Sequence, residues 1–221
     1  MSGESPAGEG ARDRILGRVR AAVSGAPDAP EPVRDYRVSH SPGDPGALLD
    51  LLDRNLTEYR ARVHRAAEGE LPSLIARLLA ERGAASVVVP PGLPGAWLAD
   101  TAAELRHDAP GRPLSPYALD GTDAVVTGCA LAIAETGTIV LDGSAGQGRR
   151  ALTLVPDLHV CVVRAPGQVV ASVPLALPRL DPGRPLTWIS GPSATSDIEL
   201  DRVEGVHGPR TLDVVLVAAP S

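Results

Sequence analysis

Residues 123–143 read DAVVTGCALAIAETGTIVLDG, and this stretch decides the fold class. It contains three short apolar runs, which are separated by a Thr-Gly pair and by Glu-Thr-Gly. Short apolar runs bounded by turn residues are typical of buried β-strands. We therefore expect consecutive strands here, buried within a sheet that helices flank.

On both sides of this stretch, predicted helices alternate with predicted strands. Helices are predicted at 72–83, 95–106, 166–175 and from the turn at 192–199 onward. Strands are predicted at 85–92, on either side of Pro156 within 149–165, at 186–191 and at 211–218. Such alternation predicts an α/β domain with a mainly parallel sheet flanked by helices.

The first 46 residues differ in character from the rest of the chain. We expect disorder over the first ten residues, a short amphipathic helix at 11–24 and a proline-rich linker at 25–46. The domain proper is then predicted to span 47–221, and to open with a helix at 47–67. The chain thus reads as one domain with an N-terminal helical extension.

Composition narrows the class of protein. The 221 residues are 43% hydrophobic and carry a net charge of −6, which is typical of a globular protein and gives no reason to expect nucleic-acid binding. All 21 basic residues are arginine, so Schiff-base chemistry and a P-loop lysine are excluded. No apolar stretch could span a bilayer and no signal core is evident, so we expect a cytoplasmic protein.

The two cysteines, Cys129 and Cys161, lie in apolar surroundings. We interpret them as buried, reduced thiols. Neither has the closely spaced Cys or His neighbours that a metal or iron–sulfur site needs, so no intrinsic metal site or cofactor is expected.

Glu135 ends an apolar run and precedes a Thr-Gly-Thr turn. Ligands of open α/β sheets gather where strands end, so this carboxylate could act as a base or a nucleophile. The alternative is a strand-end glutamate that accepts hydrogen bonds from the turn amides. Both interpretations remain open on the sequence.

Two further segments suggest a site. Residues 190–199 contain Ser193 and Asp197, which suit a helix start and could form an anion site there, although capping alone explains most of the pattern. His207 lies in a loop between glycines, which favours binding or catalysis about as much as a structural role. His159 is either a core histidine or a site member.

Four blocks, taken in order, resemble the LUD domain family of the lactate-utilisation C type. They are VVTGCALAIAETGTIVL (125–141), LVPDLHVCVV (154–163), ISGPSATSDIEL (189–200) and VEGVHGPRTLDVVLV (203–217). The resemblance covers about residues 45–221. It implies a fold resembling the ribose-5-phosphate isomerase and CoA-transferase group. It also implies partners, an iron–sulfur LUD protein and a cysteine-rich protein, with which members oxidise L-lactate to pyruvate.

The resemblance also implies a pocket. The matching positions are Glu135, Thr136, Gly137, Thr138, Pro156, His159, Gly191, Pro192, Ser193, Asp197, Glu199, His207 and Gly208. Among them Glu135 and His207 are the catalytic candidates. Arg149 and Arg210 are candidate clamps for a substrate carboxylate, because a guanidinium binds a carboxylate bidentately.

Our leading hypothesis is a subunit of a multi-subunit lactate oxidoreductase, with any iron–sulfur cluster on the partner subunits. One alternative is a stand-alone isomerase or CoA-transferase-like enzyme that uses Glu135. Another is a non-catalytic assembly protein that docks through the helix predicted at 47–67.

Overall fold

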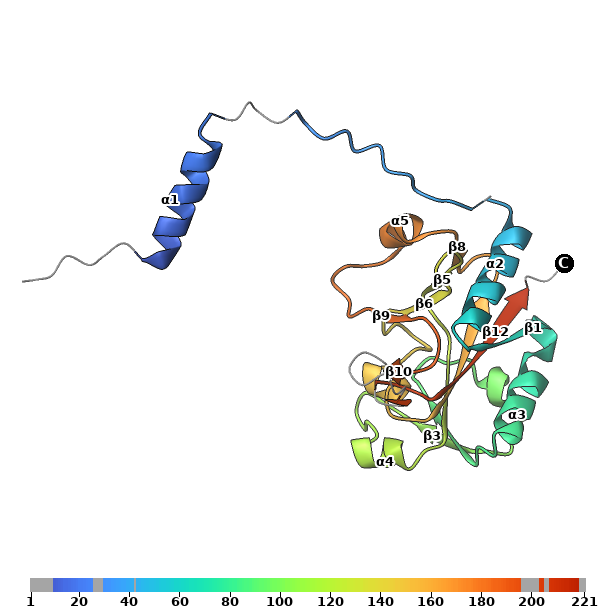
Figure 1. The fold of residues 1–221 in the computed structure, drawn as a ribbon. Coiled ribbons are helices and arrows are strands. Elements are labelled where there is room, and N and C mark those ends of the chain that lie inside the picture. The colour runs from blue at the N-terminus through green and yellow to red at the C-terminus, as the bar shows by residue number, and fades with distance from the viewer. Residues whose placement is uncertain (1–9, 26–29, 42, 196–202, 205–206, 219–221) are drawn as a thin grey trace, which may run out of the picture. The chain divides into compact units, whose positions relative to one another are not determined.

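The structure is a computed structural model that describes residues 10–25, 30–41, 43–195, 203–204 and 207–218 (Figure 1). The chain divides into two compact units, 1–36 and 37–221. The first unit contains helix α1 (Ala11–Val23), none of whose residues is buried. The helix predicted at 11–24 is thus confirmed, whereas the disorder predicted for the first ten residues falls almost wholly outside the described residues.

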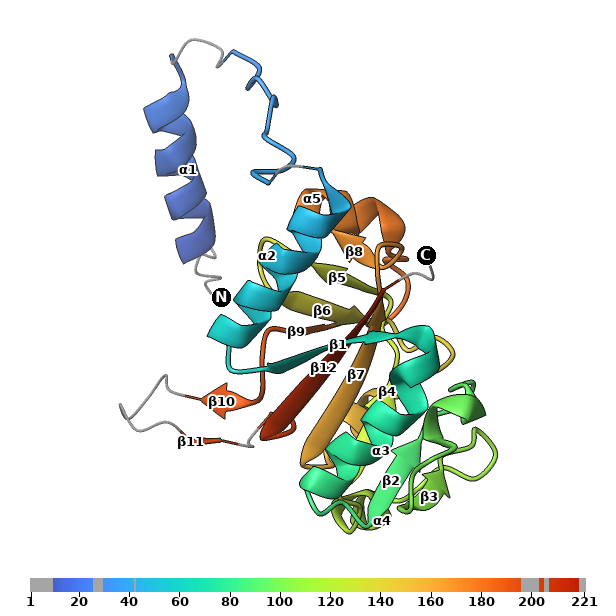
Figure 2. The ribbon, with the colours of Figure 1, turned by 90° about the vertical axis from the view of Figure 1, so that its right-hand side faces the viewer.

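A six-stranded parallel sheet forms the centre of the second unit (Figure 2). Its strands run in the order β1 (Arg62–Ala67), β12 (Thr211–Ala218), β7 (Leu158–Arg164), β4 (Ala124–Thr127), β2 (Ser86–Val89) and β3 (Glu104–His107). Every neighbouring pair is parallel. The predicted α/β class with a parallel sheet flanked by helices is confirmed.

Helix α3 (Leu71–Glu81) covers one face of this sheet. Alternate residues of β7, such as Val160 and Val162, point to this face and pack against Ile75 and Leu79 of the helix. The residues between them, Cys161 among others, point to the opposite face. Because strand side chains alternate in this way, the central strands are apolar on both faces and need cover on both.

The opposite face is covered by helix α2 (Pro45–Glu58) and by a second sheet. That sheet has the order β8 (Val169–Val170), β5 (Leu131–Ile133), β6 (Thr138–Leu141) and β9 (Thr187–Ile189). Leu52 and Leu56 of α2 are fully buried here. The apolar side of α2 is therefore part of the domain's own core.

Short elements complete the described chain. They are the 3-10 helices η1 (Glu68–Glu70), η2 (Gly95–Leu98), η3 (Arg150–Thr153) and η4 (Leu177–Arg179), helices α4 (Pro116–Asp120) and α5 (Val173–Ala176), and the antiparallel pair β10 (Ala194–Thr195) and β11 (Val203–Glu204). Helix α5 packs on the outer side of the second sheet.

Several element predictions were wrong, and in two of them pairing with distant strands outweighed the local pattern. The helix predicted at 47–67 ends at Glu58, and residues 62–67 instead pair with β12. Only residues 95–98 of the helix predicted at 95–106 are helical, and residues 104–107 form strand β3. The first strand predicted within 149–165 is instead the 3-10 helix η3, which packs through Leu152.

Two predicted helices need a further correction. The helix predicted at 166–175 is replaced by strand β8 followed by the short helix α5. In the segment predicted to open a helix at 192–199, residues 194–195 are a strand and residues 196–199 lie outside the described residues.

Candidate functional site

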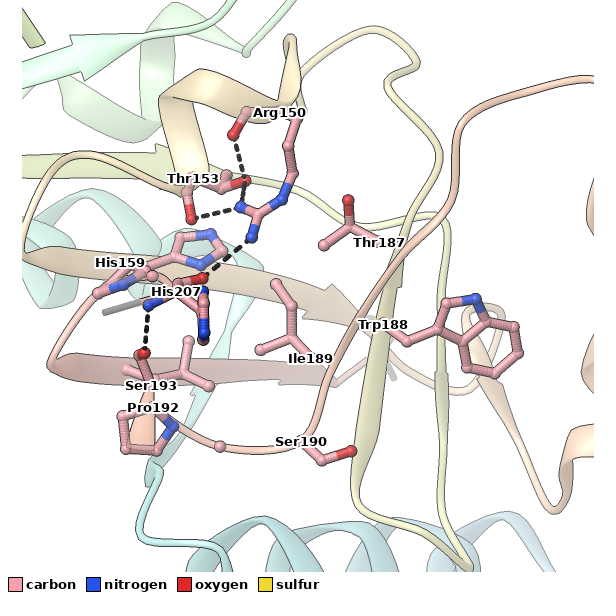
Figure 3. A pocket seen from close by; sticks show the side chains of 14 residues that line it. Arg150, Thr153, His159, Thr187, Trp188, Ile189, Ser190, Pro192, Ser193 and His207 are labelled. Carbon is pink, nitrogen blue, oxygen red and sulfur yellow. Dashed lines mark hydrogen bonds between the residues drawn. The ribbon is translucent and has the colours of Figure 1, made fainter. Parts of the chain in front are cut away.

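A cavity of about 240 Å³ lies beside the first residues of β7 and β12 (Figure 3). It lies on the same sheet face as Cys161 and Val214. His159 and Leu212 are two residues before them on β7 and β12, and side chains two positions apart on a strand point to the same face. It is lined by Arg150, Thr153, His159, Leu212 and residues 187–193 and 207–209. The cavity therefore draws its lining from four separate parts of the chain.

Arg150 supplies the positive charge of this cavity. One guanidinium nitrogen, Nη1, donates to the Thr153 backbone oxygen at 3.0 Å, and Nη2 donates to the His207 backbone oxygen at 3.2 Å. Within the residues that the structure describes, Arg150 contacts no carboxylate. Burial lowers the pKa of this guanidinium, because removal of water disfavours the charged form. A cation that, among the described residues, is held by neutral acceptors in partly dry surroundings is suited to binding an anion.

His159 forms part of the cavity wall and is 1% exposed. Its Nε2 atom lies 2.8 Å from the hydroxyl oxygen of Thr127, which belongs to the neighbouring strand β4. This bond fixes the ring within the cavity wall. The imidazole is thus held in a fixed orientation by the neighbouring strand.

Backbone contacts hold the two loops that close the cavity. The His207 amide donates to Ser193 Oγ at 3.0 Å, and the Ser193 amide donates to the Pro209 oxygen at 2.9 Å. Gly191 has a φ of +86°, and a Cβ built there would lie 2.2 Å from the backbone oxygen of Tyr59. Only glycine fits this close approach, so the loop conformation is specified by sequence.

The structure brings about half of the predicted site residues together. The cavity contains His159, Gly191, Pro192, Ser193, His207 and Gly208. Thr138 lies at its border, since its hydroxyl is 2.8 Å from that of Ser190, and Thr136 in turn donates to Thr138. Gly137 packs against the backbone of Asn55 instead. Asp197 and Glu199 lie outside the described residues.

Glu135 lies elsewhere, outside the lining of this cavity. Its Oε1 atom accepts four hydrogen bonds, from the hydroxyls of Ser39 and Ser41 and from the amides of His40 and Ser41, at 2.6–2.9 Å. Burial alone raises the pKa of Glu135, but these bonds outweigh it and lower the pKa to about 2. Such a carboxylate is a weak base, so the geometry does not favour proton abstraction by Glu135.

The two predicted clamps are already paired with carboxylates. Arg149 binds Asp108 through two hydrogen bonds of 3.0–3.1 Å, and Arg210 binds Asp157 at 2.7 Å. The arginine in the cavity is Arg150, which the sequence analysis missed. The adjacent pair Arg149-Arg150 indicated this region, but the sequence does not show that Asp108 pairs with Arg149 and leaves Arg150 to line the cavity.

Cys129 and Cys161 are both buried and free, which confirms the interpretation of buried, reduced thiols. Among the described residues, no group of three or more His, Cys, Asp or Glu side chains could hold a metal ion. Nor is any helix of the described chain long and apolar enough to cross a membrane.

The LUD domain family model matches residues 49–217, and the chain belongs to this family. It is 45% identical to the lactate utilization protein C of Deinococcus radiodurans, over 94% of this chain and 95% of that protein. A protein of the same name from Geobacillus kaustophilus is 26% identical over 77% of this chain and 78% of its own length. A crystal structure of a DUF162 family protein from Deinococcus radiodurans aligns with a TM-score of 0.66 at 42% identity, covering 80% of this chain and 99% of that one.

Proposed function

We propose that this protein takes part in bacterial lactate utilisation, as a subunit of a system that oxidises L-lactate to pyruvate. The names of its relatives support the first part of the proposal. The observation that carries the second is the Arg150 guanidinium, a cation without a described carboxylate partner in a cavity of small-molecule size. Lactate and pyruvate are small monocarboxylates, which is the ligand class that such a cation selects.

In this proposal Arg150 holds the substrate carboxylate, and the histidines handle protons. Oxidation of lactate to pyruvate releases two electrons and two protons. His159, held by Thr127, would accept the hydroxyl proton, and His207 would accept the proton of the C2–H bond as the two electrons of that bond leave. Iron–sulfur clusters on the partner subunits, the iron–sulfur LUD protein and the cysteine-rich protein, would receive the electrons.

The alternatives of the sequence analysis receive less support. A stand-alone isomerase or CoA-transferase would need Glu135 as base or nucleophile, yet its Oε1 is saturated by four donors. If the protein only helped to assemble the system, the cavity at Arg150 would have no role. The growth assay with Arg150→Gln tests this alternative.

The test compares Arg150→Gln with Arg77→Gln, a control on the exposed side of α3. Purified variants are titrated calorimetrically with L-lactate and pyruvate. Because a charge-assisted hydrogen bond contributes about 1.5–3 kcal/mol, Arg150→Gln should weaken binding roughly 10- to 100-fold, whereas the control should match wild type. Equal affinity in all three proteins would refute the carboxylate site.

A growth assay then tests the role in the cell. In a strain that lacks the gene and has no other lactate oxidase, wild type and Arg77→Gln should restore growth on lactate, while Arg150→Gln should not. Full rescue by Arg150→Gln would favour a subunit that only assembles the system.

A further inference from the structure

A second, larger cavity of about 820 Å³ adjoins the first. The two share Arg150, Thr153 and Thr187 in their linings. The second is bounded by the segments that follow β2 and β3, by the loop after β6, and by the approach to β9. Arg150 therefore stands at the junction of a small polar compartment and a larger one.

The walls of the second cavity are largely apolar. Prolines form much of the surface, among them Pro91, Pro110 and Pro185, and Ala109, Leu141 and Ala145 add aliphatic groups. Rigid walls of this kind suit an apolar group, because little side-chain freedom is lost when a ligand binds.

The charged side chains that line the second cavity indicate the net charge of a ligand that would fit there. Arg149 is paired with Asp108, and Arg184 is paired with Asp142 at 2.9 Å. Both of these carboxylates are largely buried, so the pairs belong to the wall. The described lining therefore has three arginines against two aspartates, which leaves one positive charge, on Arg150. This balance matches a monoanion and disfavours a polyphosphate.

We propose that the two cavities form one binding site for a monocarboxylate with a bulky apolar substituent. The carboxylate lies at Arg150, and the substituent occupies the second cavity. This inference rests on the carboxylate site proposed above and extends its ligand class from lactate to 2-hydroxy or 2-oxo acids with branched alkyl or aryl side chains. Each buried methylene group should tighten binding roughly fourfold.

The experiment is a calorimetric titration of the full chain with L-lactate, 2-hydroxy-4-methylpentanoate, 3-phenyllactate and ADP. The two bulky acids should bind at least about tenfold more tightly than lactate, since several apolar groups leave water, and ADP should not bind. Equal affinity of lactate and 3-phenyllactate would overturn the inference, as would tight binding of ADP.

Variants locate the apolar end of the site. Ala145→Trp and Ala109→Trp each place a large side chain in the second cavity from an exposed wall position. Two variants are used so that the test still works if one of them does not fold. Each variant that folds should lose the preference for 3-phenyllactate over lactate and should keep the wild-type affinity for lactate. If both variants still bind 3-phenyllactate more tightly than lactate, the second cavity does not hold the apolar substituent.

The two proposals can fail separately. If Arg150→Gln leaves the affinity for every acid unchanged, the carboxylate site itself is wrong. If Arg150→Gln weakens lactate binding but wild type binds 3-phenyllactate no better than lactate, only the second cavity is wrongly assigned.

Discussion

At the scale of single residues, Glu135 illustrates how partners decide what a side chain can do. Its carboxylate receives hydroxyl and amide donors from Ser39, His40 and Ser41, a segment almost one hundred positions earlier in the chain. These bonds hold it as an anion and attach residues 39–41 to the end of β5. The residue that looked most like a catalyst in the sequence thus fastens one part of the domain to another.

This attachment predicts a pH dependence of stability. The pKa of Glu135 is about 2 in the folded chain against an ordinary value of 4.5. Because folding lowers the pKa, the stabilisation is complete above about pH 4.5 and is lost as the pH falls toward 2. The difference in free energy of unfolding between wild type and Glu135→Gln should therefore shrink from pH 6 to pH 3, as measured by urea denaturation. An identical difference at both pH values would contradict this role.

At the scale of elements, one buried carboxylate links a helix to two strands. Asp213 of β12 is fully buried, accepts two-pronged hydrogen bonds from Arg82 at the end of α3, and lies 2.9 Å from Nε2 of His64 on β1. A carboxylate at this position is tolerated because its partners replace the lost water. The α3 helix and the edge strand β1 are thereby attached to the centre of the sheet.

Removing one partner should be costly. Arg82→Ala leaves a buried charge partly uncompensated, and we expect a loss of about 3–5 kcal/mol in the free energy of unfolding. The matched control is Arg77→Ala, which breaks an exposed helical pair with Glu81 and should cost less than about 1 kcal/mol. Urea denaturation measures both. Similar losses in the two variants would show that the Asp213 cluster contributes no more than a surface ion pair.

At the scale of the whole molecule, the two compact units predict independent behaviour. The unit 37–221 contains its own core on both faces of the large sheet, and α1 has no buried residue. Deletion of residues 1–36 should leave the thermal unfolding midpoint within about 2 °C of wild type. Deletion of residues 1–41 also removes the donors to Glu135 and should lower the midpoint further. A large drop from the shorter deletion would contradict this division.

The α/β class, most of the central strands and the family could be predicted from the amino-acid sequence. Short apolar runs bounded by glycine and proline are local signals, and the order of motifs such as Thr136-Gly137-Thr138 and Gly191-Pro192-Ser193 is a property of the chain alone. The sequence also grouped His159, Ser193 and His207, which do line one cavity.

Which side chains contact one another could not be predicted from the sequence, because it depends on the folded chain. Residues 62–67 became a strand because β12 offers a partner along their whole length. Arg150 lines the smaller cavity and Arg149 does not, and Arg149 is instead paired with Asp108. Such outcomes depend on contacts between residues far apart in the chain, and a local pattern carries no information about the partner that a side chain will find.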